Sequence, residues 1–144
     1  MGLLTPLTEV GHKVLLSIED DDAEYHLIKM AVDEINMAIH LLRVKDGEEA
    51  MWFLKRSHGH EIAPRPDLIL LNLNLPKKNG FEVLTDLQHS ESLRSIPVVM
   101  FTSTKTASER KKALALGADD FISKPNTLDE LLETIKAVCS RFLA

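Results

Sequence analysis

Two adjacent carboxylates directly follow a short apolar run near the start of this chain. Glu19 and Asp20 come immediately after VLLSI, residues 14–18. Adjacent carboxylates with carbonyl oxygens close by suit a hard divalent cation such as Mg²⁺. A second run, LILLNL, contains Asn72 and is followed by Asn74. The acidic pair is therefore a candidate metal site. Asn72 and Asn74 place polar side chains at the end of a second apolar run.

Hydroxyl and ammonium groups follow two further apolar runs. Thr102 and Ser103 lie at the end of PVVMFT and just after it, and Lys124 stands between FIS and Pro125. A lysine ammonium and a hydroxyl suit the oxygens of a phosphoryl group. Each also has an ordinary explanation, because Lys124 could be an exposed loop lysine and Thr102 could simply end a strand. The chemistry depends on whether the fold brings these groups together.

Five apolar runs have the character of strands in a parallel sheet. They are nearly continuous rather than alternating, which favours strands covered on both faces. The runs are VLLSI (14–18), AIHLLRV (38–44), LILLNL (68–73), PVVMFT (97–102) and FIS (121–123).

The stretches that follow the runs begin with helix-capping signals. Each places a capping side chain three residues before a glutamate, at Asp21/Glu24, Asp46/Glu49, Asn79/Glu82, Thr106/Glu109 and Thr127/Glu130. Gly117 lies where the fourth helix should end in a left-handed cap. The last helix has an apolar stripe, made of Leu128, Leu131, Leu132, Ile135, Val138, Cys139 and Phe142. The chain therefore reads as five strand–helix units.

Repeated strand–helix units predict an α/β fold with a doubly wound parallel sheet and helices on both faces. In such sheets the functional groups gather at the carboxyl ends of the strands. All the polar residues described above follow strand ends. We therefore expect them to meet at one edge of the sheet.

The composition indicates one globular domain over residues 13–144, preceded by a loose leader over residues 1–12. The chain has 144 residues, a formal net charge of −5 and one cysteine. The acidic balance argues against nucleic-acid binding, and no apolar stretch approaches the roughly 20 residues that span a bilayer. A single cysteine, expected in the core as Cys139, fits a reducing cytoplasm.

With these motifs in this order, the chain resembles the receiver domain of two-component response regulators from about residue 13 to residue 142. The motifs are Glu19-Asp20, N-L-N-L-P-x-x-N-G from Asn72 to Gly80, Thr102-Ser103 and Lys124-Pro125. The segment PRPDLILLNLNLPKKNG looks most like stand-alone receivers that partner cyanobacterial phytochrome kinases. The resemblance implies the flavodoxin-like receiver fold, with five parallel strands in the order 2-1-3-4-5.

The resemblance also implies a role for each site residue. In the family, an aspartate at the position of Asn72 accepts a phosphoryl group from a sensor histidine kinase, with Mg²⁺ bound beside it. Carried over, the Mg²⁺ ligands are Glu19, Asp20, Asn72 and the backbone of Asn74; the phosphoryl contacts are Thr102, Ser103 and Lys124; and the switch pair is Thr102 and Phe121.

Asn72 is the main departure from the family pattern, and Asn79 is a lesser one because an aspartate is usual there. Forming an aspartyl phosphate needs a carboxylate oxygen as the nucleophile, and an amide oxygen is far less nucleophilic. Glu19, Asp20 and Lys124 sum to −1, against −2 if residue 72 were a carboxylate. We therefore expect weak Mg²⁺ binding and no phosphorylation. The asparagine is either natural or introduced to trap the unphosphorylated state.

The expected partners are a sensor histidine kinase of the phytochrome type and a second copy of the chain. In receivers the fourth helix, fifth strand and fifth helix form the usual output or dimer surface. Here that surface would combine Phe121 as an aromatic anchor with a basic group, which is otherwise read as a solvated face: Lys105, Arg110, Lys111 and Lys112.

An enzyme or cofactor protein of similar topology is the alternative to a non-enzymatic signalling protein. A flavodoxin-like flavin site needs phosphate-cradling loops, whereas the first strand here is followed by Glu-Asp-Asp-Asp, which repels phosphate unless a cation intervenes. A metal-dependent phosphatase of the aspartyl-phosphate type would need the carboxylate that is missing at Asn72. A flavin absorbance band in the purified protein would revive the flavin alternative.

Overall fold

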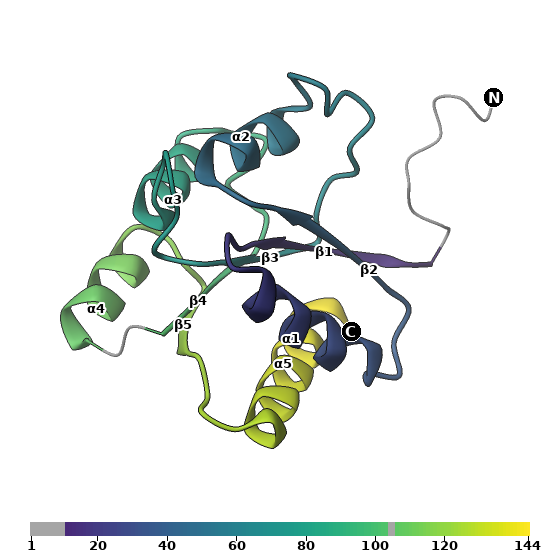
Figure 1. Ribbon diagram of the computed structural model, residues 1–144. Helices are drawn as coiled ribbons and strands as arrows, with labels where there is room; N and C mark the ends of the chain where they lie inside the picture. The colour runs from purple at the N-terminus through teal and green to yellow at the C-terminus, as the bar shows by residue number, and fades with distance from the viewer. Residues whose placement is uncertain (1–10, 104–105) are drawn as a thin grey trace.

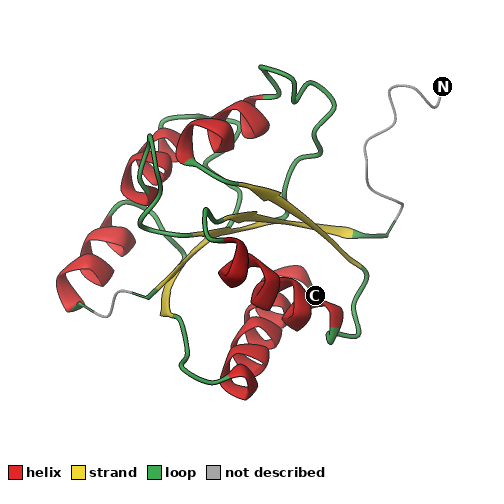
Figure 2. Cartoon of the chain, in the orientation of Figure 1, coloured by secondary structure: helices red, strands yellow, loops and turns green. Residues whose placement is uncertain are grey.

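The chain forms a five-stranded parallel sheet with helices on both faces, as predicted (Figures 1 and 2). This computed structural model describes residues 11–103 and 106–144. The strand order is β2-β1-β3-β4-β5. Along the chain the elements are β1 (Lys13–Ile18), α1 (Asp22–Asp33), β2 (Ile39–Val44), α2 (Gly47–Lys55), β3 (Leu68–Leu71), α3 (Gly80–Gln88), β4 (Val98–Thr102), α4 (Ala107–Ala115), β5 (Asp120–Ser123) and α5 (Leu128–Leu143).

The core is divided by the sheet into two layers, because successive strand residues point to opposite faces. Leu16 and Ile18 of β1 face α2, α3 and α4, while Leu15 faces α1 and α5. Figure 1 shows the same division, with α1 and α5 together on one side. Burial of β1 and β3 on both faces explains why their sequences are continuously apolar.

The helices begin where the capping residues predict. Asp21, Asp46, Asn79, Thr106 and Thr127 are the N-caps of α1 to α5, and each accepts a hydrogen bond from the backbone N–H three residues later. Among the helices described here, Asn79 alone forms the reciprocal capping box, in which the Glu82 side chain also accepts from the Asn79 backbone N–H.

Gly117 follows the end of α4 with φ of +107°. A Cβ there would stand 2.5 Å from the Gln88 side chain, so both the left-handed backbone and the close approach favour glycine. This confirms the predicted stop of the fourth helix.

Some sequence expectations differ from the structure or lie beyond its description. β3 ends at Leu71, so Asn72 stands in the loop after the strand. Leu128, expected in the apolar stripe of the last helix, is 43% exposed because it begins the helix beyond the edge of the core. Lys105 and most of the expected leader lie outside the described residues. Within the described part of the chain, no helix is long and apolar enough to cross a membrane.

Candidate functional site

Most of the predicted site residues, but not Thr102 or Phe121, meet in a hollow at the carboxyl edge of the sheet, which we call the acidic hollow. It has a volume of about 190 Å³. The loops after β1, β3, β4 and β5 and the first turn of α1 supply its lining: Glu19, Asp20, Asp21, Glu24, Asn72, Asn74, Ser103 and Lys124. The parallel topology brings these loops together, because all four strands end at the same edge.

The side-chain amide of Asn72 donates hydrogen bonds to the acidic pair. Its Nδ2 lies 3.1 Å from Glu19 Oε2 and 3.3 Å from Asp20 Oδ1. The same nitrogen lies 3.3 Å from the backbone oxygen of Asn74. These three oxygens belong to residues predicted as metal ligands. An amide N–H group therefore occupies the oxygens that a cation would otherwise coordinate.

Lys124 neutralises the buried member of the acidic pair. Its Nζ lies 2.8 Å from Glu19 Oε1 and 3.4 Å from Glu24 Oε2. The Lys124 side chain is 10% exposed and that of Glu19 is 2% exposed. Because a buried carboxylate is costly without a partner, this ion pair and the Asn72 amide together satisfy Glu19 within the protein.

Arg43 fixes the backbone of the acidic loop from the neighbouring strand β2. Its Nε donates to the backbone oxygen of Glu19 at 2.9 Å, and its Nη1 lies 2.8 Å from Asp22 Oδ1. The hydrogen bond from Arg43 lowers the pKa of the Asp22 carboxyl, with Lys45 adding to the effect. The guanidinium also lies over the Tyr25 ring, 4.8 Å from its centroid, and burial raises the pKa of Tyr25.

The charge around the hollow is more negative than predicted. Four carboxylates line it against one lysine, a formal charge of −3 instead of −1, because Asp21 and Glu24 also reach the hollow. Both extra carboxylates already have partners: Asp21 Oδ1 accepts from the Glu24 backbone N–H at 3.0 Å, and Glu24 contacts Lys124. They add negative potential but are not free ligands.

The two hydroxyl residues after β4 occupy different positions. Ser103 lines the acidic hollow, whereas Thr102 is fully buried and accepts a hydrogen bond from the Lys124 backbone N–H at its carbonyl oxygen, at 2.8 Å. In this conformation Ser103 is the hydroxyl residue that reaches the hollow.

Phe121 is 4% exposed and packs in the core beneath α4. The expectation that Phe121 serves as an exposed interface anchor is therefore wrong. Two described members of the basic group also have partners within the chain. Arg110 Nη1 donates to the Phe121 backbone oxygen at 2.7 Å, and Lys112 Nζ lies 4.4 Å from the centroid of the Phe81 ring.

Glu24 and Arg43 are the site residues that the sequence analysis missed. Glu24 was assigned only a capping role, but its carboxylate turns to Lys124, and the Asp21 N–H donates to Glu19 Oε2 instead, at 3.2 Å. The sequence around Arg43 contains no motif that indicates a role at the site, beyond its place at the end of the second apolar run. The core assignment of Cys139 is confirmed, because it is fully buried.

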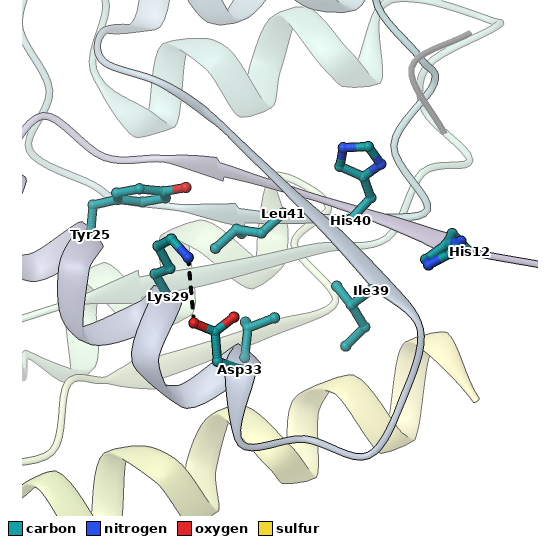
Figure 3. A pocket seen from close by; sticks show the side chains of 8 residues that line it. His12, Tyr25, Lys29, Asp33, Ile39, His40 and Leu41 are labelled. Atoms are coloured by element: carbon teal, nitrogen blue, oxygen red, sulfur yellow. Dashed lines mark hydrogen bonds and ion pairs between the residues drawn. The ribbon is translucent and has the colours of Figure 1, made fainter. Parts of the chain in front are cut away.

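A larger hollow of about 350 Å³ lies between α1 and the edge strand β2 (Figure 3). Its lysine, Lys29, is paired with Asp33 at 3.4 Å, and both side chains are mostly exposed. Figure 3 shows His40 on the opposite side of β2 from Ile39 and Leu41. The polar groups there do not converge on one point, so the acidic hollow remains the candidate site.

Comparison with known proteins identifies the family. The response regulator receiver domain matches residues 15–136. Response regulator Rcp1 of Synechocystis sp. is 34% identical over 131 residues, which cover 91% of this chain and 89% of that protein. The crystal structure of the phosphorylated cyanobacterial phytochrome response regulator RcpA has a TM-score of 0.88 at 34% identity, covering 92% of this chain and 95% of that one.

A third similarity is to the crystal structure of the Mn²⁺-bound form of response regulator Rcp1. It has a TM-score of 0.85 at 34% identity and covers 91% of this chain and 94% of that chain. The chain belongs to the response regulator receiver domain family. The predicted fold and the predicted likeness to cyanobacterial phytochrome response regulators are both confirmed.

Proposed function

We propose that this chain is a receiver of two-component signalling in which Asn72 occupies the acceptor position and no phosphoryl group is taken up. The observation that carries the proposal is the pair of hydrogen bonds from Asn72 Nδ2 to Glu19 and Asp20, at 3.1 and 3.3 Å. These contacts with the acidic pair support the assignment of residue 72 to the acceptor position. They also support the loss of acceptance, because the Asn72 nitrogen is a hydrogen-bond donor and the reaction needs a nucleophile.

The chemistry of phosphoryl transfer gives the reason. In the family's transfer, a carboxylate oxygen attacks phosphorus and forms the acyl phosphate bond while the bond from phosphorus to the kinase's histidine nitrogen breaks. The Asn72 amide is neutral, and its nitrogen holds two hydrogens directed at acceptors. Lys124 and Ser103 line the hollow, but the bond-forming atom is missing.

A divalent cation would be held by Glu19, Asp20 and the backbone oxygen of Asn74, with the side-chain oxygen of Asn72 as a further ligand. All four residues line the acidic hollow, and hard oxygen donors suit Mg²⁺. In the family the ion neutralises charge on phosphoryl oxygens. A bound cation would have to displace the Asn72 amide nitrogen from the same oxygens, so we propose weak binding.

The receiver would then signal from a state that is set without phosphate. In the family, an aromatic at the position of Phe121 swings inward when the hydroxyl at the Thr102 position closes on the phosphate. Phe121 is 4% exposed here and Thr102 is fully buried, with an amide at position 72. The buried aromatic supports a phosphate-independent receiver, in which inward packing of Phe121 is uncoupled from phosphorylation.

The proposed partner is a sensor histidine kinase of the phytochrome type, contacted in the cytoplasm without catalysis by this chain. Support comes from the names of relatives at 34% identity, one of which is a cyanobacterial phytochrome response regulator. A homodimer through α4, β5 and α5 is a second proposed contact. Ile122, Val138 and Phe142 line a hollow of about 240 Å³ on that face.

Intact mass spectrometry after incubation with acetyl phosphate and Mg²⁺ tests the function directly. The protein should remain unmodified at residue 72. A gain of one phosphoryl group that fragmentation maps to Asn72 or to a neighbour in the acidic hollow would contradict the proposal.

A further inference from the structure

Three cationic side chains line one hollow at the opposite end of the sheet from Asn72. Pro66 precedes the start of β3, whereas Asn72 follows its end, so the two hollows lie at opposite edges. This second hollow, which we call the basic hollow, has a volume of about 390 Å³. Its lining contains no carboxylate and consists of Leu54, Lys55, Arg56, Arg65, Pro66, Ser90, Ser92 and Leu93.

The three cations lack the carboxylate partners that most other described lysines and arginines have. Lys124, for example, pairs with Glu19, and Arg141 pairs with Asp120. Among the described residues, Lys55, Arg56 and Arg65 form no ion pair with a carboxylate within 4.0 Å. On a chain of formal charge −5, unpaired cations gathered in one concave place create a local site for an anion.

The ends of the neighbouring helices do not account for this gathering. The last carbonyls of α2 already accept from backbone N–H groups, including Arg56 N to Phe53 O at 3.2 Å and Ser57 N to Trp52 O at 2.9 Å. Cations near a helix C-terminus gain only about 0.3–1 kcal/mol at exposed positions. Arg65 belongs to no helix, so the helix dipole does not explain its presence.

Arg65 is held in place before any ligand arrives. Its Nη1 donates to the Ser92 backbone oxygen at 2.5 Å, and its Nη2 donates to Ser95 Oγ at 3.0 Å. These two bonds connect the loop before β3 to the loop after α3. A guanidinium fixed in this way loses little conformational freedom on binding an anion.

Arg56 also adopts a backbone conformation that arginine rarely takes. It ends α2 with φ of 55° and ψ of 51°, in the left-handed region. Glycine or asparagine normally occupies such a position, because other side chains crowd the backbone there. An arginine kept in this conformation is an outlier of the kind that clusters at ligand sites.

We propose that the basic hollow binds a small molecule bearing a phosphate or diphosphate group. Arginine forks and serine hydroxyls match the oxygens of a phosphate, and Leu54 and Leu93 give the hollow an apolar floor. The volume lies at the lower end of the range of small-molecule sites. The concave shape favours a small anion over a flat macromolecular surface. The site would report the level of such an anion through the loops around β3.

Amide NMR titration of the full chain with inorganic pyrophosphate tests this, with NaCl at matched ionic strength as the reference. Saturable shifts should centre on the amides of Arg56, Arg65, Ser90 and Ser92. Arg65→Gln should weaken the affinity by about ten-fold or more, because a charge-assisted fork is lost. Arg56→Gly removes a charge while suiting the left-handed backbone, so it should weaken binding and leave the fold intact.

Arg94→Gln is the matched control, since Arg94 is an exposed arginine of the same loop that does not line the hollow. Its affinity for pyrophosphate should stay within about two-fold of the parent. Shifts that match those in NaCl, or an unchanged affinity in both Arg65→Gln and Arg56→Gly, would overturn the proposal. Binding to anionic-lipid vesicles or to oligonucleotide without saturable pyrophosphate binding would also overturn it.

Discussion

Lys124 Nζ lies 2.8 Å from Glu19 Oε1, although the two residues are 105 positions apart in the chain. The contact joins the loop after β5 to the loop after β1 across two intervening strands. The Glu19 side chain is 2% exposed and that of Lys124 is 10% exposed, so the pair is largely shielded from solvent. The acidic hollow is therefore a structural element of the fold as well as a candidate binding site.

Replacing Lys124 by methionine should destabilise the protein. Glu19 would remain buried with its counter-charge gone, and removing one partner of a buried pair typically lowers the free energy of unfolding by about 3–5 kcal/mol. Urea unfolding followed by circular dichroism measures the change. Adding Glu19→Gln in the same chain should recover most of the loss. A Lys124→Met protein as stable as the parent would contradict the role given to this ion pair.

Mg²⁺ should bind the acidic hollow with an affinity no tighter than about 1 mM, because the neutral Asn72 side chain adds no ligand charge and its nitrogen holds oxygens of Glu19 and Asp20. Amide NMR or Trp52 fluorescence can follow the titration. Asp20→Ala should abolish it, and Asn72→Asp should tighten it by about ten-fold or more through the added charge. Micromolar affinity of the parent for Mg²⁺, lost in Asp20→Ala, would show that the Asn72 amide does not weaken cation binding.

The stability of the protein should fall at alkaline pH because of Cys139. Burial raises the pKa of its thiol from 9.0 to about 11. The neutral thiol is thus favoured in the folded state, so stability is retained below about pH 9 and lost as the pH rises toward 11. Two pKa units correspond to about 3 kcal/mol. Unfolding curves for the parent and Cys139→Ala should converge over this window, and a constant difference between them would contradict the prediction.

Self-association through α4, β5 and α5 should depend on the apolar hollow between β5 and α5. Ala137→Glu places a charged carboxylate on its rim, near Arg141, and should weaken association by about ten-fold or more because docking would have to desolvate that charge. Light scattering over a range of concentrations measures this, with His26→Glu on α1 as the control. A parent protein that stays monomeric at high concentration would rule out the dimer.

Docking of the kinase on α4 is tested separately by Lys111→Glu. Unchanged kinase binding in Lys111→Glu would argue against docking through α4.

The positions of the helices follow from local chemistry and are therefore predictable from sequence. Asp46, for example, caps α2 through its own Oδ1 and the backbone N–H of Glu49, at 2.7 Å. Such a contact depends on four consecutive residues and survives in almost any fold. The meeting of Glu19 with Lys124 was predictable for a different reason, because parallel strands bring their carboxyl ends to one edge.

The structure differs from the sequence-based predictions at side chains that can contact more than one partner. The Glu24 carboxylate could cap α1 or reach Lys124, and only the tertiary arrangement selects the second. Phe121 lies on a strand whose two faces have different coverage, so its burial depends on how α4 packs. Arg43 reaches Glu19 from a neighbouring strand, a contact set by the parallel register that no local pattern records.

The central claim is that Asn72 alone separates this chain from a working phosphoryl acceptor. The decisive measurement is the intact mass of the parent, Asn72→Asp and Asn72→Asp/Asp20→Ala after incubation with acetyl phosphate and Mg²⁺. Asn72→Asp is nearly isosteric and supplies both a nucleophile and a negative charge beside Glu19 and Asp20. We expect no addition to the parent, one phosphoryl group on Asn72→Asp, and its loss in the double variant. Phosphorylation of the parent, or an Asn72→Asp protein that stays unmodified, would contradict the account.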